Sequence, residues 1–552
     1  MLAFFIDNMA PIMFLALVLF LLLGYPAAFS LGAVGLLFGL IGIELGLFVP
    51  DFLQALPERV YGVMNNDTLL AIPFFTFMGL VLERSGMAED LLDTIGQLFG
   101  TVRGGLAYAV IFVGALLAAT TGVVAASVIS MGLISLPIMM RYGYDRRVAS
   151  GVIAASGTLA QIIPPSLVLI VMADQLGRSV GDMYEGAFIP GLVLSCLYAF
   201  YVFLVTLVFP KATPGLPPEA VGFREANGGR GLTSLAILTV VSALFGWYRM
   251  RDSNTHGADF VVLTMFYGIM FAFAVAVLDW LIEKSFKVRV LSYIARQTTF
   301  VMVPPLFLIF LVLGTIFLGV ATPTEGGAMG AVGALILGLL KRRLSFDLIR
   351  QAVQSTAKLS AFVVFILVGA RVFSLTFYGV SGHIWVEHLL TSLPGGQVGF
   401  LLFVNAFVFV LAFFLDFFEL AFIIIPLLGP AAEKLGIDLI WFGVILGVNM
   451  QTSFMHPPFG FALFYLRSVA PKEPYIDRVT GKKTDGITTG QIYWGAVPFV
   501  VIQVVMVVLV ITFPAMVMHY KRGLSNVDPN KVKIDVPALD NLPPPDVQFN
   551  FK

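Results

Sequence analysis

Oxygen-bearing side chains interrupt two long apolar stretches of the chain, and these side chains are its strongest candidates for chemistry. The first interruption holds Thr120, Thr121 and Gly122, and the second holds Asp416 and Glu419. A chain that turns back inside a membrane leaves carbonyl and N–H groups without helical partners. Hydroxyl, carboxylate and carbonyl oxygens are hard ligands suited to Na⁺, whereas the N-terminal ends of half-helices favour an anion. We therefore predict that these positions are the ion-binding tips of two re-entrant hairpins.

Two proline pairs lie within other apolar segments, and polar residues precede each pair. Proline donates no backbone N–H and its ring clashes with the preceding turn, so a Pro-Pro pair interrupts a helix. In hydrocarbon the exposed polar backbone is tolerated only where protein or a water-filled cavity receives it. Two helices broken at matching places in two halves of a chain indicate a transporter's binding site near the membrane midplane. The residues assigned to these breaks are Ser156, Gly157, Thr158, Pro164 and Pro165 in the first half, and Asn449, Gln451, Thr452, Pro457 and Pro458 in the second.

Structural roles compete with ion binding at most of these positions. Thr120 and Thr121 are also compatible with hydrogen bonds back to their own helix, and the polar residues at 449–452 with packing between helices. A carboxylate such as Asp416 is harder to explain by structure alone, because it costs roughly 2.5–3.5 kcal/mol at that depth. Arg371, within a predicted span, is a candidate partner for it. Further candidates for substrate or ion contact are Thr322, Thr324, Glu325 and Arg371.

The composition is that of a polytopic membrane protein. Of the 552 residues, 59% are hydrophobic and 12% are charged, against about 25% charged in soluble domains. The net charge is zero and no basic stripe is present, so nucleic acid is not an expected partner. One cysteine, five histidines and the lack of a nucleophile elbow or P-loop favour neither an enzyme nor a resident cofactor.

The chain repeats itself. The segment 24–35 resembles 321–333, Leu136-Pro137 matches Ile425-Pro426, and the Pro-Pro pairs follow in the same order. The matching positions are about 290 residues apart, which is typical of two structural repeats. We expect a first repeat at 1–210, a polar loop with two inserted transmembrane helices at 211–297, a second repeat at 298–518, and a polar tail at 519–552.

Basic residues give the orientation. If the N-terminus is periplasmic, the predicted cytoplasmic loops hold 22 of the 33 Lys and Arg residues, as the positive-inside rule requires. The hairpins, predicted at 104–139 and 397–431, then enter from opposite sides. The predicted fold is therefore an all-α polytopic membrane protein of two inverted-topology repeats, each with a re-entrant helical hairpin and a Pro-Pro-broken helix.

These residues together resemble the large membrane (DctM-like) subunit of tripartite ATP-independent periplasmic (TRAP) transporters. The similarity runs through Ile72–Gly79, Arg103–Ala107, Ile163–Ser166, Ala321–Glu325, Leu415-Asp416 and Asn449–Gly460. Thr120-Thr121-Gly122 replaces a more common Ser-Gly-Ser tip, and His456 stands where a Thr is common. The insert resembles that of the longer, mannitol/chloroaromatic-type subunits.

The resemblance implies a Na⁺-driven importer of a small organic anion in a bacterial or archaeal inner membrane, with an elevator motion. It also implies two partners, a small four-helix membrane subunit and a periplasmic substrate-binding protein. Two alternatives remain open at this stage. One is a stand-alone carrier of the divalent-anion or citrate type, and the other is a non-transporting membrane scaffold or receptor.

Overall fold

The computed structural model describes residues 2–223, 225, 229–253, 257–477 and 479–519, without the side chains of residues 2–3, 120–121 and 257–259. Before residue 211 the helices are α1 (Leu2–Asp7), α2 (Met9–Leu22), α3 (Ala27–Glu44), α4 (Leu56–Met64), α5 (Ala71–Arg84), α6 (Met87–Phe99), α7 (Gly105–Thr121), α8 (Val124–Arg141), α9 (Arg146–Thr158), α10 (Leu167–Leu176) and α11 (Val180–Val208).

The second half repeats this order after a pair of intervening helices. The pair is α12 (Leu232–Met250) and α13 (Gly257–Phe286), and it is followed by α14 (Tyr293–Phe317), α15 (Pro323–Leu340), α16 (Phe346–Gly379), α17 (Gly382–Thr391), α18 (Gly396–Leu411), α19 (Phe417–Ile423), α20 (Ile425–Lys434), α21 (Leu439–Met455), α22 (Phe461–Val469) and α23 (Thr489–Thr512). Short 3₁₀ turns are η1 (Pro50–Ala55), η2 (Asp67–Leu70), η3 (Leu159–Gln161), η4 (Pro218–Ala220) and η5 (Pro514–Met516). The strands β1 (Tyr475–Ile476) and β2 (Lys483–Thr484) pair antiparallel, with Tyr475 opposite Thr484.

The fold is a polytopic membrane fold, as predicted. In the described part of the chain nine helices are long and apolar enough to cross a membrane, or eleven if each of two bent helix pairs forms one span. Hydrocarbon offers no partner to a free backbone N–H or C=O, so helices satisfy these groups internally. Many large apolar side chains on these helices are exposed, including those of α12 and α13, which is the surface that lipid would cover.

Helix packing shows that the two halves are equivalent. The pair α3–α16 and the pair α5–α15 make the most extensive contacts in the molecule, and each pair joins one half to the other. In the repeat order α3 corresponds to α15 and α5 to α16, so the two pairs are the same interaction with the partners exchanged. Glycine allows the close approach: a Cβ on Gly35 would lie 2.8 Å from the Phe373 backbone, and one on Gly369 would lie 2.4 Å from the Ala28 carbonyl oxygen.

Each half contains the predicted re-entrant hairpin. In the first, α7 ends at Gly122, whose φ of +59° is a left-handed conformation, and α8 begins at Val124. In the second, α18 ends near Leu411 and α19 begins at Phe417, with Asp416 as its N-cap. The turns lie at the positions predicted from the interrupted apolar runs, and the flanking helices extend a few residues beyond the predicted bounds.

Pro164-Pro165 and Pro457-Pro458 each interrupt a helix, as predicted, whereas a third pair, Pro304-Pro305, lies inside the continuous helix α14. The first break separates α9 and η3 from α10, and the second separates α21 from α22. In both breaks the peptide bond between the two prolines is cis. Around the breaks, α23 packs on α9 and α11 packs on α21, which is again one interaction with its partners exchanged.

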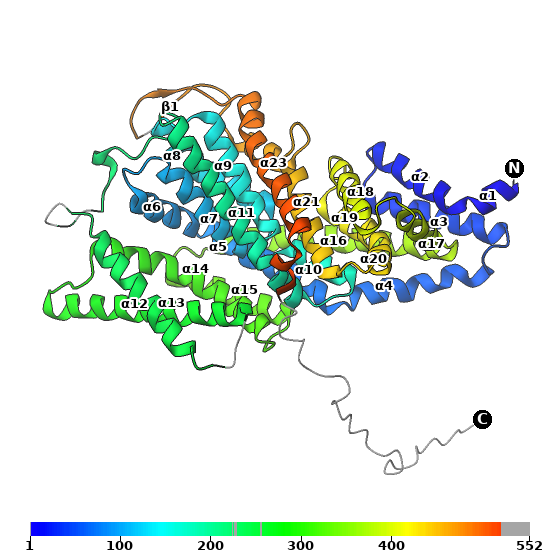
Figure 1. Ribbon diagram of the computed structural model, residues 1–552, viewed down its shortest axis with the longest axis horizontal. Helices are drawn as coiled ribbons and strands as arrows, with labels where there is room; N and C mark the ends of the chain where they lie inside the picture. Colours follow the sequence, from blue (N-terminus) through cyan, green and yellow to red (C-terminus); the bar gives the residue numbers. More distant parts are fainter. Residues whose placement is uncertain (1, 224, 226–228, 254–256, 478, 520–552) are drawn as a thin grey trace, which may run out of the picture.

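The inserted helices α12 and α13 pack on each other and on α14, and Figure 1 shows them at one edge of the molecule. Their positions agree with the two apolar segments expected between the halves. The domain boundaries assigned from the sequence remain predictions, and the predicted tail from residue 520 onward lies outside the described residues.

Candidate functional site

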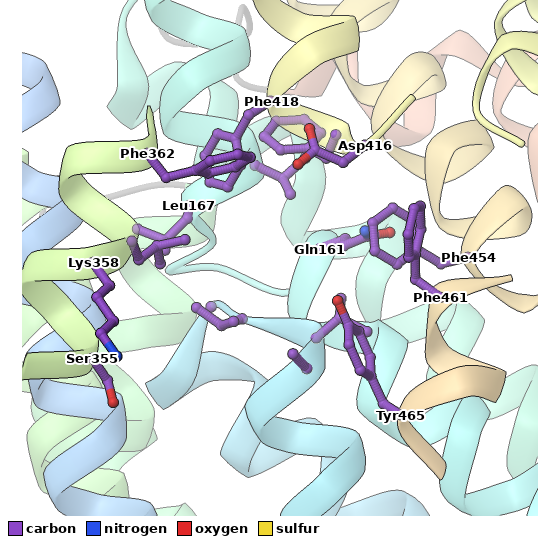
Figure 2. Close-up of a pocket in the computed structure, with 17 residues that line it drawn as sticks. Gln161, Leu167, Ser355, Lys358, Phe362, Asp416, Phe418, Phe454, Phe461 and Tyr465 are labelled. Atoms are coloured by element: carbon purple, nitrogen blue, oxygen red, sulfur yellow. The ribbon is translucent and has the colours of Figure 1, made fainter. Parts of the chain in front are cut away.

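A cavity of about 560 Å³ lies where both hairpin tips meet both helix breaks. Figure 2 shows Ser355 and Lys358 reaching it from α16 on one side and Tyr465 from α22 on the other. Its lining is Gly122, Val123, Val124, Ala125, Gln161, Leu167, Val168, Ser355, Lys358, Leu359, Phe362, Asp416, Phe417, Phe418, Phe454, Phe461 and Tyr465. We call this space the inner cavity.

Four helices begin at the inner cavity. The first residues of α8 (Val124), α10 (Leu167), α19 (Phe417) and α22 (Phe461) all belong to its lining. The N-terminal N–H groups of a helix have no intrahelical acceptor, and the helix dipole places partial positive charge there. The starts of α8, α10 and α22 carry no side-chain cap, whereas that of α19 is capped by Asp416. Together with the Lys358 ammonium, the three uncapped ends favour a negatively charged ligand in the cavity.

Asp416 forms a capping box with Glu419. The Glu419 N–H donates to Asp416 Oδ1 at 2.8 Å, and the Asp416 N–H donates to Glu419 Oε2 at 3.0 Å. These bonds satisfy two backbone donors that the start of α19 would leave unpaired inside the membrane. Both carboxyl groups therefore have a structural role, but only Asp416 also lines the inner cavity.

Gln161 presents an unpaired oxygen at the first helix break. Its side chain is 1% exposed, and its Oε1 atom has no hydrogen-bond partner among the described residues. A buried polar atom without a partner is costly, roughly 1–3 kcal/mol. Because Gln161 lines the inner cavity, a bound ion or solute is a natural partner for this oxygen.

Behind the cavity, a buried hydrogen-bond network joins the two broken helices. Gln451 Nε2 donates to Thr158 Oγ1 at 3.2 Å, so the second break contacts the residue that leads into the first. Gln503 Nε2 donates to Tyr198 Oη at 2.7 Å and to Thr158 Oγ1 at 3.4 Å. The network connects α9, α11, α21 and α23 below the breaks.

Most of the residues predicted at the breaks lie in this supporting layer and not in the cavity lining. Ser156 Oγ donates to the Val152 carbonyl at 2.7 Å, and Thr452 Oγ1 to the Val448 carbonyl at 3.2 Å. Asn449 Nδ2 donates to the Asn405 carbonyl at 2.8 Å, which fastens α21 to the second hairpin. Pro164, Pro165 and Pro457 are at least partly buried, Pro458 is exposed, and none of these residues lines the inner cavity.

Gly157 has a packing role beside Thr158. A Cβ on it would lie 2.3 Å from Val128 Cγ2, so glycine lets α9 approach α8 closely. At the first tip, Gly122 lines the cavity, whereas the side chains of Thr120 and Thr121 lie outside the described residues.

The four further candidates lie elsewhere. Thr322 and Glu325 form an exposed capping box at the start of α15, with the Thr322 N–H donating to Glu325 Oε2 at 2.8 Å. Thr324 Oγ1 donates to the Asp67 carbonyl at 2.5 Å. Arg371 lines a second cavity and forms no ion pair with Asp416. The sequence interpretation that paired these two residues is therefore not supported.

Four polar lining residues were not identified from the sequence: Gln161, Ser355, Lys358 and Tyr465. Lys358 had been counted among the basic residues of a cytoplasmic loop, because it follows a charged stretch beginning at Lys341. Its place on the 34-residue helix α16 shows that the helix continues through that stretch. Gln161 was recognisable as a polar residue just before a Pro-Pro pair.

An ion pair fixes the end of the first hairpin to the loop after the second break. Arg141, the last residue of α8, donates to Asp477 through Nε at 3.0 Å and Nη2 at 3.1 Å. The Arg141 guanidinium, with the Thr480 hydroxyl, holds the pKa of the Asp477 carboxyl well below its usual range. Among the described residues no group of three or more His, Cys, Asp or Glu side chains is placed to hold a metal ion.

Comparison with known proteins gives a consistent family. A family model described as "Tripartite ATP-independent periplasmic transporter, DctM component" matches residues 14–516. The C4-dicarboxylate TRAP transporter large permease protein DctM of Pseudomonas aeruginosa is 28% identical over 483 residues, covering 86% of this chain and 92% of the relative. The isethionate TRAP transporter permease protein DctMQ of Oleidesulfovibrio alaskensis is 26% identical, covering 83% of this chain and 60% of the relative. The crystal structure of the Alcanivorax borkumensis YdaH transporter aligns over 85% of this chain and 90% of that chain, with a TM-score of 0.47 and 15% identity.

Proposed function

Because the chain belongs to the tripartite ATP-independent periplasmic (TRAP) transporter family, as its DctM component, we propose that it imports a small organic anion, a carboxylate, together with Na⁺. The family is one of transporter permeases, so the chain is a membrane transport subunit and not an enzyme. The observation that carries the proposal is the convergence of three uncapped helix N-termini, those of α8, α10 and α22, and Lys358 on one cavity.

The anion is expected in the middle of the inner cavity. Lys358 supplies one full positive charge, and the ends of α8 and α10 supply unpaired N–H donors. The volume of about 560 Å³ falls in the range of small-molecule sites. The solutes named for two relatives, C4-dicarboxylate and isethionate, are small organic anions, which is consistent with this charge.

Na⁺ is expected at the two tips, next to the breaks. The helices that end there, α7 and α18 in the hairpins and α9 and α21 before the breaks, leave C-terminal carbonyls without intrahelical partners. Carbonyls of this kind coordinate Na⁺ in transporters with broken helices. The Asp416 carboxylate and the Gln161 Oε1 atom add side-chain oxygens on the cavity side.

Helix packing favours an elevator motion. The frame is formed by α3, α5, α15 and α16, which pack pairwise, and the unit that carries the tips and breaks is formed by α7–α11 and α18–α23. Lys358 belongs to the frame, whereas Gln161 and Asp416 belong to the other unit. The inner cavity therefore lies at the boundary where such a unit would slide.

The remaining assignments follow from the family. We expect a bacterial or archaeal inner membrane, a periplasmic N-terminus, a small four-helix membrane subunit and a periplasmic binding protein that delivers the solute.

The test is solute uptake into proteoliposomes that contain this chain and its small subunit. The solutes are succinate and any compound bound by a binding protein that a neighbouring gene encodes. We expect uptake to require an inward Na⁺ gradient and the binding protein. Uptake without a Na⁺ gradient would contradict the proposed coupling of solute transport to Na⁺. Uptake by this chain alone would instead support a stand-alone carrier.

A further inference from the structure

A second cavity, of about 540 Å³, lies between α4, α10, α16 and α20, and it shares no residue with the inner cavity. We call it the outer cavity, because its lining comes from the helix ends predicted to face the periplasm. Three parts of the chain, α10, α16 and the second hairpin, line both cavities. The second hairpin contributes Phe418 to the inner cavity and Phe422 to the outer cavity. The rings of Phe418 and Phe422 stack with their centroids 6.3 Å apart.

Two arginines of the outer cavity have no carboxylate partner. Arg59 of α4 and Arg371 of α16 both line it, and neither forms an ion pair with a described residue, whereas neighbouring cations are paired. Both arginines line the same cavity, together with Tyr378. Arg371 is partly buried within a membrane-spanning helix, where a guanidinium without an anion is expensive, whereas Arg59 is an exposed residue of the cavity lining.

The carboxylates of the same lining already have donors. Glu433 pairs with Arg178 at 2.8 Å. Asp174 accepts from Asn66 Nδ2 at 2.8 Å and from Gln175 Nε2 at 2.6 Å. The arginines are therefore the groups whose donors remain available to a ligand, and a carboxylate matches the planar fork of a guanidinium.

We propose that the outer cavity is a second anion site, in which Arg371 and Arg59 hold the carboxylate of the solute before it reaches the inner cavity. Arg371 and Lys358 stand 13 residues apart on α16, which is about 20 Å along the helix axis. One frame helix thus offers a cation to the anion at each level. The role before transport rests on the proposed function, whereas the binding site itself does not.

Binding without Na⁺ tests the site. Equilibrium dialysis of ¹⁴C-succinate against the purified full chain would be run in a choline buffer of low ionic strength. We expect saturable binding that weakens about tenfold or more in Arg371→Gln and in Arg59→Gln, because each removes a charge-assisted contact. Arg371→Lys should keep part of the affinity. Arg59 is exposed, so its variant remains informative if Arg371→Gln fails to fold.

The matched control is Arg350→Gln, which removes an exposed positive charge of the same helix, α16, outside both cavities. It should bind succinate as the unchanged protein does. No saturable binding, or binding unaffected by both cavity variants, would overturn the site.

Transport separates this proposal from the proposed function. Arg371→Gln should raise the solute concentration for half-maximal Na⁺-driven uptake about tenfold, with a smaller effect on the maximal rate. If Na⁺-driven uptake is unchanged in Arg371→Gln, the outer site is not part of the transport path, and the proposed function is unaffected. If the chain binds succinate in an arginine-dependent way but shows no Na⁺-driven uptake, the outer site is supported and the proposed Na⁺ coupling is contradicted.

Discussion

At the scale of single residues, a conservative substitution can separate the capping role of Asp416 from its proposed role in Na⁺ binding. Asn caps a helix about as well as Asp does, so Asp416→Asn should keep the bond from the Glu419 N–H and change the unfolding free energy by a few tenths of a kcal/mol. It removes the charge offered to Na⁺. We expect the Na⁺ concentration for half-maximal uptake to rise at least tenfold, measured in proteoliposomes at fixed solute.

The chain provides a control for that substitution. Thr322 and Glu325 form the same capping box at the exposed start of α15, outside both cavities, so Glu325→Gln should leave the Na⁺ dependence unchanged. An Asp416→Asn protein with the Na⁺ dependence of the unchanged chain would assign Asp416 to helix capping alone.

Gly122 is required by its backbone conformation at the first tip. Its φ of +59° costs an L-residue roughly 1–2 kcal/mol, and an added Cβ would lie 3.0 Å from Leu167 Cγ, at the start of α10. Gly122→Ala should therefore both destabilise the protein and abolish most uptake. Gly143→Ala carries a similar backbone cost at φ +79° but meets open space. It should lose stability and keep uptake when compared at equal amounts of folded protein.

Residue chemistry was only partly legible in the sequence. Asp416, Glu419 and Gly122 were identified because a polar interruption inside an apolar run demands an explanation. Ser156, Asn449 and Thr452 look equivalent in the sequence, but they bond to carbonyls in the supporting layer. Which face of a helix looks into a cavity depends on packing between segments hundreds of residues apart. Lys358 was missed because the sequence placed it in a cytoplasmic loop, whereas it lies on α16.

At the scale of elements, the connection between α8 and the loop after α22 should be sensitive to acid. Arg141 lowers the pKa of Asp477, so the ionised carboxylate stabilises the fold. That contribution is complete above the ordinary Asp pKa of about 3.9 and is lost as the pH falls below it. Asp477→Asn should lower the melting temperature at pH 7, and the difference from the unchanged protein should shrink toward pH 3.

Asp485→Asn is the appropriate comparison for Asp477→Asn. Its ion pair with Arg146 is exposed, with 75% of the Asp485 side chain accessible, and exposed pairs contribute little. A melting temperature that falls equally in both variants would show that the Arg141 pair has no special role. Melting curves of the purified chain in detergent between pH 3 and 7 supply the measurement.

Elements were more predictable than residues, because helix breaks and hairpin turns leave local signals. Pro164-Pro165 and Pro457-Pro458 follow polar residues and mark the breaks, whereas Pro304-Pro305 lies inside the unbroken helix α14. The helices α12 and α13, at 19 and 30 residues, are long enough to span. The exchange of partners between α3–α16 and α5–α15 was not predictable. It depends on glycine contacts such as Gly35 with Phe373, which become visible only when both helices are placed.

At the scale of the whole molecule, the proposed elevator motion would make the contact between the second hairpin and α16 temporary. The rings of Phe362 on α16 and Phe418 on α19 have centroids 6.4 Å apart. In a Cys196→Ser background, Phe362→Cys with Phe418→Cys joined by a short bis-thiosulfonate should fix this arrangement and stop uptake, and a reductant should restore it. The matched pair Phe29→Cys and Phe365→Cys joins α3 to α16 within the frame, where the ring centroids are 5.1 Å apart, and its cross-link should leave uptake intact. Uptake that continues with the hairpin fastened to α16 would show that the unit does not slide along this helix. Loss of uptake with both pairs would show that the frame itself must bend.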